Sequence, residues 1–90
     1  TWIAVELHHA VDDEARLTRL DELAAAHGLP QVAAGDVHMH VRRRKALQDV
    51  LAATRLNTTV AAAGLALFAN GERHLRSRAA LAALYRPELL

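Results

Sequence analysis

Gln31-Val32-Ala33-Ala34-Gly35-Asp36-Val37-His38-Met39-His40 is the stretch that decides the fold. Its first half is short, apolar and ends in a glycine, a pattern that predicts a buried strand from Gln31 to Gly35. Side chains two residues apart on a strand point to one face, so Asp36 and His38 are expected to leave the strand end together. In α/β folds, ligands bind at the carboxyl ends of the strands. The stretch therefore predicts both a strand and a candidate site.

A second strand and a helix precede this stretch. Residues 2–8 alternate between aliphatic and mixed positions, as a strand does. Asp12 or Asp13 can begin a helix that Gly28 ends and Pro30 prevents from continuing. A strand, a helix and a strand with short connections form a βαβ unit, which has parallel strands and a right-handed crossover. The predicted fold class is therefore α/β.

Helices are expected to follow the βαβ unit. Arg42 to Arg55 has an apolar stripe at helical spacing. The next part, up to residue 74, has no clean periodicity, and we expect an extended arm with a short strand or turn around Leu65 to Phe68. Ser77 can cap a last helix that Pro87 stops. The predicted division places residues 1–56 with the strands and main helices, and 57–90 in the arm and last helix.

Composition narrows the possible functions. The chain has 90 residues, 52% hydrophobic but only 3% aromatic, and a formal net charge of +1. A net charge this small creates no overall positive electrostatic field that would attract nucleic acid. Any contact with nucleic acid through basic residues must therefore be local. The absence of cysteine excludes disulfides and thiolate ligands, and no apolar run approaches the roughly 20 residues of a membrane span. We expect a cytoplasmic protein without a membrane partner, of which this chain is an internal segment with little stability alone.

Asp36 and His38 are the leading metal-ligand candidates. A carboxylate and an imidazole suit Zn, Mn or Fe, although zinc usually takes three or four ligands. Glu6 and His8 would end near this pair if the two strands are neighbours, and could support the ligands through hydrogen bonds. His40 is a further candidate for such support, near the start of the next helix. The alternative is a capping aspartate, a surface histidine and a polar strand end facing water.

A basic run, Arg42-Arg43-Arg44-Lys45, opens the helix that follows. Arginine forks suit phosphate groups, and cations at a helix N-terminus oppose the helix dipole, which favours a functional role. Contact with phosphate or DNA is therefore one interpretation. The other is a solvated face on which Lys45 pairs with Asp49 one turn on.

Two parts of the sequence resemble a known family. Residues 28–38, followed by Ala46-Leu47-Gln48-Asp49-Val50-Leu51, are similar to the PHP (polymerase and histidinol phosphatase) domain of bacterial C-family DNA polymerases. Asp36-Val37-His38-Met39-His40-Val41-Arg42 and Asn70-Gly71-Glu72-Arg73-His74-Leu75-Arg76-Ser77 resemble most closely the error-prone branch of that family. The likeness extends over essentially all 90 residues.

This resemblance implies a fold and an activity. The PHP domain is a distorted (β/α)7 barrel with metal ligands at its strand ends, and this chain would be the C-terminal part of it. Asp36 and His38 match the family's final Asp-x-His ligand pair for a divalent metal (Zn, Mn or Fe). The longer protein would be a DNA-directed DNA polymerase, a nucleotidyltransferase in translesion synthesis, DNA replication and repair of DNA damage. Its partners would be DNA, deoxynucleotides and the rest of the polymerase chain.

The same resemblance implies that this segment has no catalytic residues. The carboxylates that bind Mg in the polymerase site, and the His-x-His pair of the first barrel strand, are not among these 90 residues. We expect the segment alone to be inactive. Two other hypotheses remain open at this point: a stand-alone PHP-type metal-dependent phosphoesterase, and a non-catalytic interaction module with a degenerate site.

Overall fold

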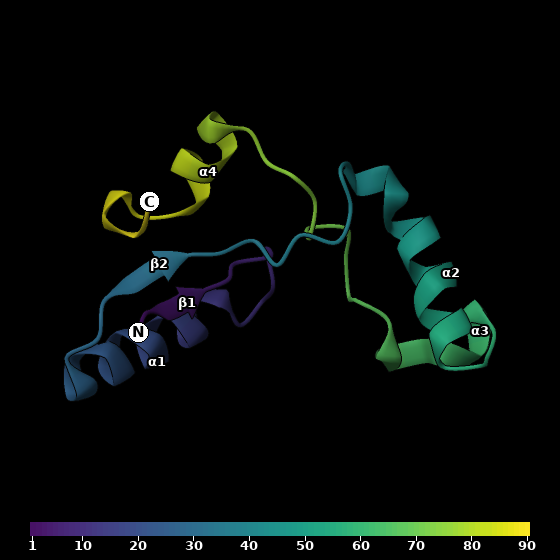
Figure 1. Cartoon of the computed structure of the whole chain (residues 1–90), viewed down its shortest axis with the longest axis horizontal. Coiled ribbons are helices and arrows are strands. Elements are labelled where there is room, and N and C mark those ends of the chain that lie inside the picture. Colours follow the sequence, from purple (N-terminus) through teal and green to yellow (C-terminus); the bar gives the residue numbers. More distant parts are fainter. The chain divides into compact units, whose positions relative to one another are not determined.

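The chain is described from Thr1 to Leu90 by a computed structural model, and it divides into two compact units. The first contains Thr1–Asp36 and Arg76–Leu90, and the second contains Val37–Leu75. Figure 1 shows the path of the chain through the elements of each unit. The elements of the first unit are the strands β1 (Ile3–Val5) and β2 (Gln31–Ala33), the helices α1 (Asp13–His27) and α4 (Arg78–Leu84), and the 3₁₀ helix η3 (Pro87–Leu89).

The sheet of the first unit has two strands, β1 and β2, which run parallel. The register pairs Ile3 with Gln31 and Val5 with Ala33. The parallel βαβ arrangement predicted from the sequence is therefore confirmed, and the fold class is α/β. Both strands are shorter than expected, since each contains three residues.

Helix α1 begins and ends where the sequence signals predict. Acidic Asp13 and Glu14 lie in its first turn, where they complement the positive end of the helix dipole. Gly28 follows the helix with a left-handed φ of 62°, and its N–H donates to the Ala24 carbonyl. A side chain at that φ would be strained, so glycine suits the position. Asp12 precedes the helix but makes no capping hydrogen bond through its side chain.

The core of the first unit joins residues from both ends of the chain. Val5 and Leu7 follow the aliphatic face of β1 and are buried together with Tyr85 and Leu89. The partly buried residues packed against them are Leu17, Leu20, Ala33, Leu81 and Leu84. Burying a large apolar side chain contributes roughly 1.5–3 kcal/mol, so the C-terminal segment stabilises the βαβ unit substantially.

The second unit is mainly helical. It contains the 3₁₀ helix η1 (Arg42–Arg44), then α2 (Lys45–Arg55), α3 (Val60–Ala63) and the 3₁₀ helix η2 (Gly64–Ala66). The helix predicted from Arg42 to Arg55 is confirmed, although its first turn is 3₁₀. The extended arm is wrong at residues 60–66, which are helical. Thr59 explains the difference, because its hydroxyl accepts from the N–H of Ala62 and caps α3.

The return segment, residues 70–75, is joined to the beginning of the second unit by backbone hydrogen bonds. Met39 and His74 form a parallel bridge, in which the Leu75 N–H donates to the Met39 carbonyl at 3.1 Å. The Asn70 side chain accepts from the Glu72 N–H at 3.0 Å, an Asx turn of the kind that the Asn-Gly pair predicts. This turn directs the return segment back along residues 37–42.

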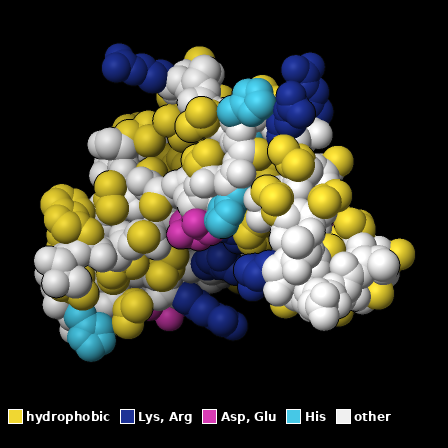
Figure 2. All heavy atoms as spheres, turned by 45° about the vertical axis from the view of Figure 1, so that its right-hand side comes forward, with side chains coloured by type: hydrophobic (Ala, Val, Ile, Leu, Met, Phe, Trp, Pro, Cys, Tyr) yellow, Lys and Arg dark blue, Asp and Glu magenta, His cyan; other side chains and the backbone are white.

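The apolar stripe of α2 is largely exposed. Leu47, Val50 and Leu51 keep about half of their surface open to solvent, whereas Ala52 and Ala53 are buried. Figure 2 shows many hydrophobic side chains on the surface of the chain. None of the helices combines the length and the apolar character that crossing a membrane requires.

Candidate functional site

Two residues with unusual backbone conformations follow the parallel strands of the first unit. His9, beyond β1, has a φ of 52°, and Asp36, beyond β2, has a φ of 45°. A positive φ is uncommon outside glycine, and such residues concentrate at functional sites. The strand predicted to reach Gly35 ends at Ala33, and the left-handed turn at Asp36 interrupts strand alternation. The strand alternation by which Asp36 and His38 were expected to leave the strand end together therefore stops before Asp36.

His8 lies at this strand end and is buried, with 8% of its surface exposed. Its Nε2 lies 3.0 Å from the Gly35 carbonyl oxygen. A carbonyl oxygen only accepts, so the His8 Nε2–H donates in this bond. Histidine ligands commonly donate one ring N–H to a carbonyl in this way. His8 thus contacts Gly35, the residue before Asp36, and Glu6 is half-buried. The expected support of Asp36 and His38 by Glu6 and His8 stays a prediction.

Tyr85 connects the two strand ends of the first unit. Its hydroxyl accepts from the Leu7 N–H at 3.0 Å and donates to the Ala34 carbonyl at 3.0 Å. The side chain is 3% exposed. Arg76 adds a longer bond of 3.4 Å from Nη1 to the Leu7 carbonyl. These contacts were not predicted from the sequence. The one signal was that Tyr85 is the sole tyrosine of a chain poor in aromatics.

His38 belongs to the second unit and Asp36 to the first. The His38 ring is exposed and meets the Phe68 ring edge-on, with 4.9 Å between centroids. The guanidinium of Arg73 lies over the same Phe68 ring, 4.4 Å from its centroid. Phe68 thus contacts both an imidazole and a cation, which gives the His38 ring an apolar neighbour on one side.

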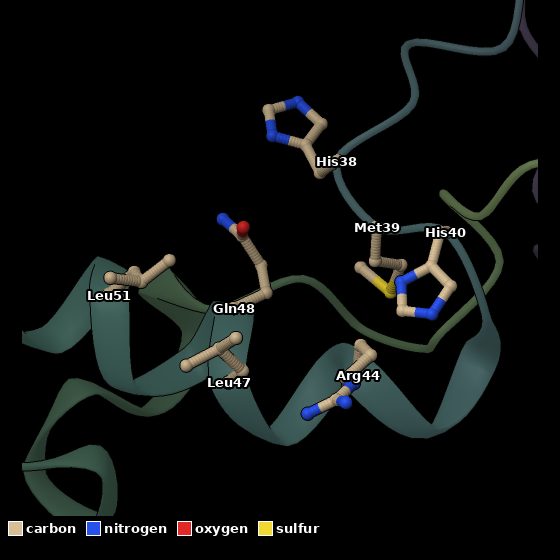
Figure 3. Close-up of a pocket in the computed structure, with 7 residues that line it drawn as sticks. All are labelled: His38, Met39, His40, Arg44, Leu47, Gln48 and Leu51. Atoms are coloured by element: carbon tan, nitrogen blue, oxygen red, sulfur yellow. The ribbon is translucent and has the colours of Figure 1, made fainter.

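His40 does not join His38 in a common cluster. Both residues line a hollow of the second unit together with Met39, Arg44, Leu47, Gln48 and Leu51. Figure 3 shows that the two imidazole rings point in different directions, with the Met39 side chain on the His40 side. His40 is exposed. Its predicted support of the metal ligands therefore stays a prediction.

The basic run divides into two kinds of residue. Arg42 makes a bidentate pair with Glu72, at 2.9 Å and 3.3 Å, and Lys45 pairs with Asp49 at 2.7 Å. The Lys45 pair was expected from the sequence, but the Arg42 pair was not. Arg43 and Arg44 are exposed and have no such carboxylate partner.

Glu72 also lies beside His74. The His74 Nε2 is 3.5 Å from the Glu72 carboxylate, near enough for an ionic contact but making no hydrogen bond. His74 Nδ1 donates instead to the Leu75 carbonyl at 2.8 Å. Arg42, Glu72 and His74 together hold the return segment, so these three side chains have a structural role in the second unit.

An ion pair fixes the opposite end of β2 in the first unit. Asp21 receives two hydrogen bonds from Arg86, the shorter at 2.8 Å, and one from Gln31 at 2.9 Å. The bonds from Arg86, followed by that from Gln31, lower the pKa of the Asp21 carboxyl, and the Asp21 carboxylate raises the pKa of Arg86. This arrangement links α1, β2 and the C-terminal segment.

The donor atoms at the strand ends fit a divalent metal in type but not in number. Asp36 supplies hard oxygen, and histidine supplies borderline nitrogen, which suits Zn, Mn or Fe. The structure contains no group of three or more His, Asp or Glu side chains that could hold a metal ion. A complete site would therefore need ligands in addition to those that this chain brings together.

No family model matches the chain, and no solved structure matches it. Among curated proteins, it is 64% identical over 89 residues to the error-prone DNA polymerase of Azoarcus sp. strain BH72, covering 99% of this chain but 8% of that protein. It is 60% identical over 90 residues to the error-prone DNA polymerase of Dechloromonas aromatica strain RCB, covering 9% of that protein. The chain is thus similar over essentially its whole length to a short segment of proteins named error-prone DNA polymerases.

Proposed function

We propose that this chain is a segment of an error-prone DNA polymerase. The observation that supports the proposal is the identity of 60–64% across essentially the whole chain. The longer protein would transfer nucleotides to a primer on a DNA template, including damaged templates, and would act in the cytoplasm during DNA repair and replication. Its Mg ions would bind carboxylates outside this chain.

Within that polymerase, the chain would form the C-terminal part of a PHP barrel. The parallel βαβ unit is compatible with such a barrel, in which strands and helices alternate. Asp36 and His38 would be ligands of its divalent metal, and the polar groups near them would hold the ligands in place. A metal there would polarise a phosphate oxygen or activate a water molecule.

A DNA contact is proposed for Arg43 and Arg44. Both are exposed, and both keep their guanidinium groups outside the carboxylate pairs that engage Arg42 and Lys45. Guanidinium forks bind phosphate oxygens bidentately, and such contacts position a protein on DNA without reading its sequence. Arg42 and Lys45 contribute mainly to the structure of the second unit.

Primer extension by the full-length protein tests the proposed activity. A primed template carrying one abasic site is incubated with the protein, four deoxynucleotides and Mg²⁺, beside an undamaged template. We expect extension on the undamaged template and continued synthesis past the lesion, both lost when a chelator removes the metal. Absence of extension on both templates would contradict the polymerase proposal. Release of phosphate from a small phosphate ester, without extension, would instead favour the phosphoesterase alternative.

A further inference from the structure

The hollow of the second unit is lined by residues of α2, of η1 and of the segment before η1 (Figure 3). Its volume is about 490 Å³, within the roughly 300–1,000 Å³ that is typical of small-molecule sites. The lining combines apolar with polar or basic side chains: Met39, Leu47 and Leu51, and His38, His40, Arg44 and Gln48. Such a lining suits a ligand that has both an apolar surface and polar edges.

The apolar part of the hollow is open to solvent. Met39 is buried, whereas Leu47 and Leu51, one turn apart on α2, keep half or more of their surface exposed. Covering this apolar surface with a ligand is favourable, because it removes the surface from water. Gln48 lies between the two leucines in the sequence, and its amide carries both hydrogen-bond donors and an acceptor. Figure 3 shows that amide on the side of α2 that faces His38.

The charge of the hollow favours an anion. Arg44 is part of the lining, Arg43 precedes it in η1, and neither guanidinium is in an ion pair with a carboxylate. No aspartate or glutamate lines the hollow. A complementary ligand therefore has a negative charge beside a flat, largely apolar ring with polar edges. A nucleotide of DNA combines a phosphate with such a ring.

We propose that the hollow binds one unstacked base of single-stranded DNA, with the adjoining phosphates against Arg43 and Arg44. A base in a duplex must first be unpaired and unstacked, which costs free energy, whereas a base in a single strand is already accessible. The hollow therefore makes this surface selective for single strands. This inference rests on the proposed DNA contact of Arg43 and Arg44, and it adds which form of DNA is bound and where a base lies.

Leu47→Ala/Leu51→Ala in the full-length protein is the test variant, since it removes apolar lining and leaves both arginines in place. Val50→Ala/Leu56→Ala is the matched control, because Val50 and Leu56 are similarly exposed but do not line the hollow. Fluorescence anisotropy measures the affinity for a labelled oligothymidylate and for a duplex of the same length. A second oligothymidylate carries one thiothymine base, which crosslinks under near-ultraviolet light to the side chain beside it.

We expect Leu47→Ala/Leu51→Ala to weaken single-strand binding by about tenfold and duplex binding by less than about twofold. The control should leave both affinities within about twofold of the wild type. In the wild type, the thiothymine should crosslink to a peptide within residues 38–51, and this crosslink should be lost in the test variant. Unchanged single-strand affinity, an equal loss in the control, or a wild type without this crosslink would overturn the inference.

Gln48→Ala is a milder variant that decides the question if Leu47→Ala/Leu51→Ala does not fold. Loss of its hydrogen bond to the base should weaken single-strand binding by about threefold, without a change in the thermal midpoint. Unchanged affinity in Gln48→Ala would then overturn the inference. A lowered thermal midpoint with unchanged single-strand affinity, in either variant, would also overturn it, because this result indicates that another part of the polymerase covers this face of α2.

Arg43→Ala/Arg44→Ala separates failure of this inference from failure of the proposed function. If the wild type binds neither form of DNA, the polymerase proposal fails and the base site fails with it. If the arginine variant weakens binding to both forms while Leu47→Ala/Leu51→Ala weakens neither, the phosphate contact is supported and the base site is wrong.

Discussion

Single residues decide how the basic run of this chain can be used. Arg42 and Lys45 lie beside carboxylates of Glu72 and Asp49, whereas Arg43 and Arg44 do not. The charge of a side chain in an ion pair is already balanced by its carboxylate partner, so such a side chain binds a phosphate less strongly. Of the four adjacent cations, Arg42 and Lys45 are thus suited to stabilise the fold, and Arg43 and Arg44 are suited to bind a phosphate.

Arg43→Ala/Arg44→Ala in the full-length protein should weaken DNA binding and reduce its salt dependence. Each lost phosphate contact lowers the slope of log affinity against log salt by about 0.9, so the double variant should reduce it by about 1.8. Fluorescence anisotropy with labelled duplex DNA, titrated between about 50 and 200 mM salt, measures both quantities. The control is Arg19→Ala/Arg55→Ala, which removes two exposed arginines elsewhere. An unchanged slope in Arg43→Ala/Arg44→Ala would contradict the assignment.

Asp21 predicts a pH dependence for the stability of the first unit. The hydrogen bonds from Arg86 and Gln31 lower the pKa of Asp21 below its ordinary value of about 3.9. A group with a lowered pKa in the folded state stabilises the fold above its unfolded pKa, and loses this effect as pH falls through its folded pKa. Asp21→Asn should therefore lower the thermal midpoint most above pH 4, and the difference from the wild type should shrink at lower pH.

The control for this pH experiment is Asp12→Asn. Asp12 is an exposed carboxylate whose contact with Arg16 is 3.7 Å long, and exposed ion pairs contribute only about 0–1 kcal/mol. We expect this variant to change the midpoint little between pH 3 and pH 7. A gap between wild type and Asp21→Asn that widens towards pH 3 would be inconsistent with the lowered pKa.

At the level of elements, close backbone contact holds the return segment in the second unit. A Cβ added at Gly71 would lie 3.1 Å from the Arg42 backbone oxygen, closer than such atoms normally approach. Gly71→Ala should therefore destabilise the bridge between Met39 and His74, by about 1 kcal/mol, as mild overpacking does. Faster amide hydrogen exchange at Met39 and Leu75 would show that the bridge has been destabilised.

Gly64→Ala provides the comparison in the same unit. Nothing lies within 4 Å of the added Cβ there, but the φ of 53° makes any side chain strained. We expect a loss of stability near α3 and η2 without faster exchange at Met39 or Leu75. If the two alanine variants speed exchange at Met39 equally, the close contact at Gly71 is not what holds the return segment.

Local signals predicted the elements better than the contacts between them. Gly28 at the end of α1 and Ser77, whose hydroxyl accepts from the Ala80 N–H to cap α4, act within a few residues and were found from the sequence. The two Tyr85 bonds span 78 and 51 residues and the Arg42–Glu72 pair spans 30, so no local periodicity in the sequence predicts them. The early end of β2 was missed because the left-handed backbone at Asp36 occurs at a residue other than glycine.

For the whole molecule, two compact units and a largely exposed apolar face on α2 characterise the chain. The chain spans 8–9% of the length of the polymerases of Azoarcus sp. strain BH72 and Dechloromonas aromatica strain RCB, which it matches over essentially its whole length. The parallel βαβ unit was predictable from sequence, since it depends on short patterns. The barrel, the division at residue 56 and the metal ligands stay predictions, because they concern neighbours that these 90 residues do not supply.

Metal content of the full-length protein tests the central claim most directly. Wild type and Asp36→Ala/His38→Ala are purified in parallel and measured by elemental analysis for Zn, Mn and Fe. Asp12→Ala/His27→Ala, which removes the same residue types from exposed positions at the two ends of α1, is the control. We expect the wild type and the control to retain metal and Asp36→Ala/His38→Ala to lose at least one ion per chain. Equal metal content in all three proteins would contradict it.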